Sequence, residues 1–139
     1  MSDMGFTPNL QATGDIKPFR FVTLSGAFTG QAATAITNQQ IGVTDGSVYQ
    51  ASPLLAANAQ FHAINGTPIT LQPSNTVQIT VGTVAVAAGA YLMPEGSGTG
   101  EAITAAGATA VSNYIALEAG QAGEVIRAYR FGQRGPIFA

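Results

Sequence analysis

Short runs of apolar and β-branched residues recur along the chain, and glycine-rich turns separate them. In the clearest run, Val77, Ile79 and Val81 are separated from one another by single polar residues. Such alternation is typical of a strand that buries one face. The pattern predicts a mainly β chain that folds as a single β-sandwich or barrel-like domain. Strands are predicted over residues 19–24, 36–43, 68–71, 77–81, 83–86, 90–93, 103–106, 114–117 and 125–131.

At most one short helix is expected, over residues 54–60. Ser52 can cap its first turn, and Pro53 fits the first helical position, where no backbone N–H is needed. The dipeptides Asp45-Gly46 and Asn65-Gly66 mark tight turns between strands. The helix is therefore a minor element of a β architecture.

A weak internal repeat divides the β pattern into two related halves. Residues 21–36 align without gaps on residues 91–106, with identity at six of sixteen positions. After a four-residue insertion, residues 41–46 fall opposite residues 115–120. Each unit has a strand, a glycine-rich turn, a second strand, a connection and a third strand. The alternative is coincidence in a chain rich in Ala, Gly and Thr, since two copies are too few for a solenoid.

The two ends of the chain depart from the β pattern. Phe6 and Leu10 are isolated apolar residues in a polar N-terminal segment. This segment is either a disordered tail or an arm that orders on a partner by docking these two side chains. Ile137 and Phe138 lie so close to the other end that we expect a partner to cover them. An N-terminal arm, a β-domain and a C-terminal tail are thus predicted over residues 1–15, 16–131 and 132–139.

The composition excludes several classes of site. The chain has no cysteine and one histidine, so it offers no disulfide framework, no thiolate metal site and no cluster of imidazole ligands. Charged residues make up 9% of the chain, against about 25% in ordinary domains. A surface so poor in charge is easily desolvated, which favours contact with other proteins. The net charge of −2 is a poor match to a nucleic acid.

We expect synthesis in a cytoplasm and no membrane segment. The first ten residues contain neither a basic region nor an apolar region of the kind found in signal peptides. The longest apolar stretch, residues 81–93, is too short to span a bilayer and is interrupted by Gly82, Thr83 and Gly89.

Two motifs resemble parts of catalytic or nucleotide sites. Gly96, Gly98 and Gly100 lack the spacing of a dinucleotide loop, and no Lys-Ser or Lys-Thr pair follows them, so a mobile turn is expected. His62 lacks a nucleophile-elbow motif, and the nearest acid, Asp45, is seventeen residues away. We therefore predict that His62 is a polar residue of the surface or of an interface.

Acidic residues also give no convincing site. Pairs of carboxylates can hydrolyse glycosides, but the four glutamates lie beside glycine-rich turns, where solvated carboxylates are common. A calcium loop needs more oxygen ligands than Asp45-Gly46 provides. Asn65-Gly66-Thr67 matches a glycosylation sequon but is explained as a turn. We expect no enzyme activity, metal or cofactor. The glutamates considered are Glu95, Glu101, Glu118 and Glu124.

Three of the five basic residues, Arg127, Arg130 and Arg134, lie near the C-terminus. On a strand, Arg127 and Arg130 point to opposite faces, so the three do not form one stripe for nucleic acid. Arginine pairs well with carboxylates in protein interfaces. Interface salt bridges are preferred here to solvated charges.

Three segments together resemble a known family. They are residues 41–46 (IGVTDG), 82–92 (GTVAVAAGAYL) and 114–127 (YIALEAGQAGEVIR). The succession resembles the small head decoration, or cement, proteins of tailed bacteriophages, and the likeness covers roughly residues 16–131. It implies a compact β-domain, a homotrimer on local three-fold positions of the outer capsid face, and no catalytic residues. The chain departs from the family in residues 51–63 and 130–139.

The expected function is that of a capsid cement protein. A trimer that touches several coat subunits gains effective concentration at each contact after the first. The expected partners are the major capsid protein and other copies of the chain, without nucleic acid or membrane. The expected location is the outer surface of the virion. The predicted interface residues are Phe6, Leu10, Arg130, Arg134, Ile137 and Phe138.

Two alternatives belong to other classes. A glycan-binding β-sandwich would stack sugars on exposed aromatic rings, but the chain has no tryptophan, and three of its four tyrosines lie in predicted strands. Another virion component of a tail, neck or fibre is also consistent with the sequence. Glycan binding would favour the first alternative, and ring-shaped oligomers would favour the second.

Overall fold

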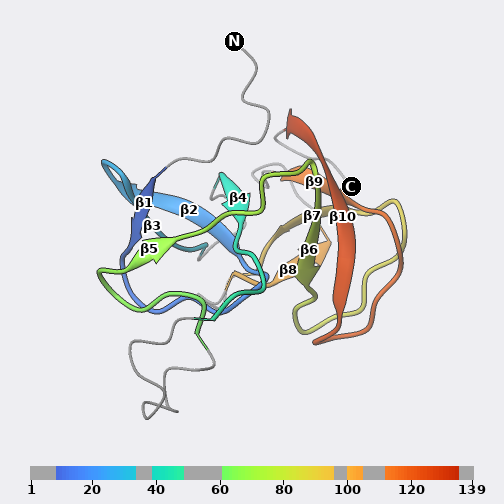
Figure 1. Ribbon diagram of the computed structural model, residues 1–139. Helices are drawn as coiled ribbons and strands as arrows, with labels where there is room; N and C mark the ends of the chain where they lie inside the picture. The colour runs from blue at the N-terminus through green and yellow to red at the C-terminus, as the bar shows by residue number, and fades with distance from the viewer. Residues whose placement is uncertain (1–8, 34–38, 49–60, 96–99, 105–111, 135–139) are drawn as a thin grey trace.

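Two five-stranded sheets make up the computed structural model, which describes residues 9–33, 39–48, 61–95, 100–104 and 112–134 (Figure 1). The first sheet has the order β4-β2-β3-β1-β5 and the second has the order β6-β10-β9-β7-β8. All strand pairs are antiparallel except β1 with β3. The first five strands are β1 (Leu10–Ala12), β2 (Phe21–Gly26), β3 (Thr29–Ala32), β4 (Gly42–Val43) and β5 (Pro68–Ile69). The others are β6 (Thr76–Thr80), β7 (Tyr91–Pro94), β8 (Ala102–Thr104), β9 (Ser112–Ala116) and β10 (Val125–Arg134).

The predicted β-sandwich or barrel-like fold is confirmed, and the described part of the chain contains no helix. The predicted helix at 54–60 lies outside the described residues. The predicted strand at 83–86 is wrong. Its Thr83 backbone N–H binds the Glu95 carboxylate at 2.8 Å, and only Val86 pairs, in an isolated bridge to Gly120. Local side-chain bonding there replaces a strand ladder.

The internal repeat corresponds to a shared arrangement of strands. In the first half, β2 lies between β3 and β4, and in the second half, β7 lies between β8 and β9. Each middle strand is antiparallel to both neighbours. The register differs between the halves, because Val22 faces Ala32 whereas the aligned Leu92 faces Thr104, two positions further along. The two halves therefore share topology but not the length of the hairpin turn.

Strand β2 supplies both hydrophobic clusters of the domain. Phe21 and Val22 are consecutive, so their side chains leave opposite faces of the strand. Phe21 belongs to the cluster of the second sheet and stacks obliquely on Tyr114, with ring centroids 5.2 Å apart. Val22 belongs to the cluster of the first sheet, with Leu10 and Ile69. Both side chains are 0% exposed, so β2 links the packing of the two sheets.

The described part of the predicted arm packs into the domain. Strand β1 lies between β3 and β5, and its Leu10 and Ala12 are buried. At the other end, β10 runs to Arg134, into the predicted tail. Strand pairing therefore continues beyond both predicted boundaries of the β-domain.

Candidate interaction surface

The predicted interface residues do not form one surface. Leu10 is 4% exposed and belongs to the core, so its side chain packs inside the domain instead of presenting a free anchor, which corrects its predicted role. Arg134 pairs with Ser112 in the register of β10 and β9. Three others, Phe6, Ile137 and Phe138, lie outside the described residues.

Arg130 is a half-buried residue with contacts inside the domain. Its guanidinium carbon lies 6.0 Å from the centre of the Tyr114 ring, and its Nη1 donates to the Ile41 carbonyl at 3.3 Å. A cation over an aromatic face is attracted by the ring quadrupole. In this position Arg130 joins β10 to the segment before β4.

Arg127 lies on the other face of β10, as predicted. Its Nε lies 3.1 Å from Glu118 Oε2, and its backbone N–H donates to the same oxygen at 2.8 Å. These two hydrogen bonds lower the pKa of Glu118. The pair joins the two ends of the turn between β9 and β10. Because both side chains are exposed to solvent, the ion pair contributes little to the free energy of unfolding.

His62 is buried inside the domain, so its predicted place on the surface or in an interface is wrong. The residue is 5% exposed, because the segment after β4 folds over it. Its Nε2 accepts from the Thr70 backbone N–H at 2.9 Å. The ring proton is therefore on Nδ1, which donates to the Ser47 carbonyl at 3.0 Å and faces Asp45 Oδ1 at 3.3 Å.

The fold brings Asp45, Ser47 and His62 together, but not with the geometry of a catalytic triad. The Ser47 hydroxyl donates to the Asp45 carboxylate. A triad base must accept the serine proton through one nitrogen while the carboxylate holds the other. Here His62 Nδ1 carries a proton and Nε2 is occupied by the backbone. This cluster is suited to holding the segment 45–47 against β5.

The four glutamates have structural contacts. Glu101 lies 3.5 Å from Arg20 Nη1, with both side chains largely buried, and burial lowers the pKa of Arg20 while Glu101 opposes that change. Glu95 accepts from Thr83, and Glu124 accepts from the Gln121 backbone N–H at 2.7 Å. Together with the Glu118 pair described above, these contacts hold turns in place.

The glycine-rich turn before β8 is described only at Gly100. Its φ is +77°, and a Cβ there would lie 2.6 Å from the Phe21 carbonyl oxygen. The Gly100 carbonyl accepts a hydrogen bond from the Phe21 backbone N–H at 2.8 Å. Gly100 therefore serves close backbone packing between the sheets. Gly96 and Gly98 lie outside the described residues.

The outer face of the second sheet carries an apolar row. Tyr129 and Tyr91 both lie opposite Ile115 in the strand register, and alternate residues of these strands point into the core. Phe131 packs edge-on against Tyr91, with centroids 5.4 Å apart. Tyr129 and Tyr91 are 41% and 36% exposed. We call Tyr91, Ile115, Tyr129 and Phe131 the tyrosine face.

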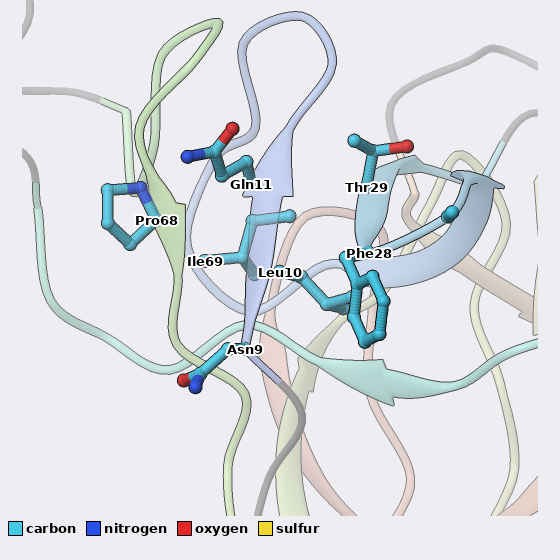
Figure 2. A pocket seen from close by; sticks show the side chains of 8 residues that line it. Asn9, Leu10, Gln11, Phe28, Thr29, Pro68 and Ile69 are labelled. Carbon is cyan, nitrogen blue, oxygen red and sulfur yellow. The ribbon is translucent and has the colours of Figure 1, made fainter.

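A groove lies at the opposite end of the domain, on the first sheet. It has a volume of about 400 Å³. Figure 2 shows β1 crossing it, with Pro68 on one side and Phe28 with Thr29 on the other. The Phe28 ring is 77% exposed, which makes it the most exposed large apolar side chain among the described residues. The lining residues are Asn9, Leu10, Gln11, Ala27, Phe28, Thr29, Pro68 and Ile69.

Sequence reasoning missed both surfaces. The strand pattern predicts strands at the tyrosines of the face but not which way their rings point, and it makes no prediction for Phe28. One signal was present, because Phe28 is a large apolar residue between Gly26 and Gly30, where turns usually carry small or polar residues.

Other kinds of site are not found in the described ranges. They contain no group of three His, Cys, Asp or Glu side chains placed to hold a metal ion. None of the described residues forms a helix long and apolar enough to cross a membrane.

Comparison with known proteins gives a likeness in fold. No protein-family model matches the sequence, and no curated protein matches it. Among solved structures, the fold is similar to that of the N base of head fiber gp8.5 from bacteriophage phi29, with a TM-score of 0.64. The two chains are 13% identical, and the match covers 92% of this chain and 96% of the other. At this identity the likeness establishes a shared fold.

Proposed function

We propose that this protein is a structural component of a tailed-bacteriophage head, and specifically a decoration protein of the outer capsid face. The observation that carries the proposal is the similarity in fold to the base of a phage head fiber over nearly the whole of both chains. The sequence resemblance to head decoration proteins, through the segments 41–46, 82–92 and 114–127, points to the same place in a virion. The proposal assigns no catalytic reaction to the protein.

The surface composition supports a role in protein contact. Charged residues make up only 9% of the chain, so few charges must be desolvated when the surface is covered. The tyrosine face offers aromatic side chains of the type that carries binding energy in interfaces. A homotrimer would present three such faces, and multivalent contact with coat subunits would hold the assembled shell together. Binding to the assembled lattice in preference to free subunits stabilises the lattice.

A second candidate is the base that attaches a fibre to the head. The neighbour in fold is itself the base of a head fiber, which is the observation that favours this role. The two roles differ in their effect on the shell. We expect a decoration protein to raise the temperature at which heads break open and a fibre base to bind heads without that effect.

The test uses heads of the encoding phage assembled without this protein. Full-length protein is titrated onto the heads and sedimented with them, and the disruption temperature of the heads is then measured. Saturable binding with a raised disruption temperature is the expected result. Binding without stabilisation favours the fibre base, and no binding at micromolar concentration contradicts both roles.

The proposed homotrimer has its own test. Size-exclusion chromatography with light scattering should give a mass of three times 14.1 kDa.

Two substitutions test whether the tyrosine face makes the contact. Tyr129→Ser removes the most exposed ring of the row and should weaken head binding about tenfold. Val84→Ser is the control, because Val84 is 63% exposed on a loop outside the row. Equal binding by both variants would remove the tyrosine face from the proposed contact.

A further inference from the structure

Two phenylalanines in the described chain have a left-handed backbone, and only one of them is explained by packing. Phe19 and Phe28 both have φ of 58°, which is strained for a bulky side chain. The Phe19 ring is half-buried and packs onto Gly46, where a Cβ would come within 2.8 Å of it. Phe28 is 77% exposed at the tip of the β2–β3 hairpin.

The fold needs the backbone of Phe28 but not its ring. The Phe28 carbonyl accepts the Gln11 backbone N–H at 3.1 Å, which ties the hairpin to β1. Glycine would allow that bond without strain, since it adopts positive φ freely. An exposed ring kept in a strained position indicates a function for the ring itself.

The groove beside Phe28 combines an aromatic wall with uncharged polar groups. Leu10 and Ile69 are buried along it, while Asn9, just before β1, and Gln11 on β1 are exposed (Figure 2). Within the described part of the chain, no hydrogen bond involves the Asn9 or Gln11 side chain. In Figure 2 both amides extend towards the Pro68 side of β1, whereas the Phe28 ring lies on the other side. A ligand that spans the groove can therefore bond to the amides at one end and cover the ring at the other.

We propose that this groove binds a neutral oligosaccharide that spans β1, with one sugar ring against Phe28 and the hydroxyls of a neighbouring ring on the side chains of Asn9 and Gln11. The groove volume of about 400 Å³ lies within the range of small-ligand sites. Its lining has no ionisable side chain, so it provides no partner for the carboxylate of an acidic sugar. This binding goes beyond the proposed role on the capsid and does not depend on it.

A peptide fits the groove less well than a sugar. Strand β1 is paired on both sides, with β3 and β5, so its backbone is not open for an added strand. An apolar side chain from a partner would leave the Asn9 and Gln11 amides without hydrogen-bond partners, which costs binding energy.

The test is an NMR titration of the ¹⁵N-labelled full chain with maltose, cellobiose and lactose, and with sialyllactose as the acidic counterpart. At least one neutral sugar should shift the backbone signals of Asn9, Gln11, Phe28 and Thr29. Phe28→Gly should weaken this binding at least about tenfold, while Phe28→Tyr keeps it within about threefold. Phe28→Gly should unfold at an equal or higher urea concentration, because the strain is relieved. Val84→Ala, another exposed apolar site, should change neither property.

Three outcomes would overturn the proposal. They are the absence of shifts with every neutral sugar, undiminished binding by Phe28→Gly, and preference for sialyllactose. If no sugar binds but Phe28→Gly loses affinity for phage heads, the groove is a protein contact and the carbohydrate proposal is wrong. If a sugar binds at the groove but the chain does not bind heads, the carbohydrate proposal stands and the proposed capsid role fails.

Discussion

At the scale of single residues, Tyr114 lies between the hydrophobic core and the Arg130 side chain of β10. Its side chain is 1% exposed, with Phe21 on one side and the Arg130 guanidinium 6.0 Å from the ring centre. Burial raises the pKa of Tyr114 above its ordinary value of 10.0, and the charge and hydrogen bond of Arg130 oppose that change. The folded protein therefore favours the neutral phenol.

This raised pKa predicts a loss of stability in alkali. A group whose pKa is higher in the folded state contributes its full stability below its unfolded pKa, and that contribution falls as the pH rises through the folded value. The urea midpoint should therefore begin to fall above about pH 10 as Tyr114 ionises in the unfolded chain. Tyr114→Phe should show a smaller alkaline fall, in urea titrations from pH 8 to pH 11.

The matched control is Tyr129→Phe, because Tyr129 lies on the exposed outer face of the same sheet. This variant should keep the alkaline dependence of the natural protein. If the urea midpoint of Tyr114→Phe falls with pH as steeply as that of the natural protein, Tyr114 does not cause the fall.

At the scale of elements, the outer edge of β6 is closed by the Gln72 side chain and by the Phe19 carbonyl, which accepts the Thr80 backbone N–H at 2.9 Å. The Gln72 amide donates to the Gln78 carbonyl at 2.8 Å and accepts the Gln78 backbone N–H at 2.9 Å. It thereby makes the two hydrogen bonds that a neighbouring strand would make. The same amide donates to the Thr44 carbonyl at 3.0 Å, which ties β6 to the end of β4. An open strand edge is a template for aggregation, and Gln72 and Phe19 together cover this one.

Gln72→Ala should therefore have two effects. Loss of three hydrogen bonds should lower the free energy of unfolding by about 1–3 kcal/mol, measured by urea denaturation. The exposed edge should also increase aggregation, measured by light scattering at high protein concentration. Gln78→Thr is the control, since the bonds use only the Gln78 backbone, and it should match the natural protein. Unchanged stability in Gln72→Ala would mean that the amide does not support the edge.

The sequence predicted the strands whose residues favour β structure by themselves. Residues 77–81 and 125–131 alternate or carry β-branched and aromatic side chains, and both regions are strands. Strand β3 (Thr29–Ala32) has no such preference, and it forms because β1 and β2 pair with it on both sides. Its Gly30 also needs to be small, since a Cβ would lie 3.0 Å from Val22. Pairing of this kind depends on tertiary contacts that a local pattern does not contain.

At the scale of the whole molecule, the candidate surfaces depend on distant parts of the chain. The groove combines residues near positions 10, 28 and 68, and the tyrosine face combines β7, β9 and β10. Neither grouping follows from spacing along the sequence. The burial of His62 is similar, because it needs Ser47 and Thr70 to satisfy the ring nitrogens. The sequence could therefore predict the fold class but not the residues that meet on a surface.

The place of β1 changes how the predicted N-terminal arm must be tested. Deletion of residues 1–15 removes the strand between β3 and β5, together with the buried side chain of Leu10. Loss of one buried leucine alone costs about 2–5 kcal/mol, so this variant should lose cooperative unfolding in urea. Deletion of residues 1–8 leaves β1 in place and should keep the urea midpoint of the full chain.

The shorter deletion therefore separates binding from folding. If Phe6 docks on the coat, deletion of residues 1–8 and the single substitution Phe6→Ala should both weaken head binding about tenfold in the sedimentation titration. Both variants keep Leu10 in the core, so a loss of binding cannot come from a broken first sheet. Binding equal to that of the full chain would show that the arm makes no contact, and the proposed attachment would then depend on the folded domain and the tail.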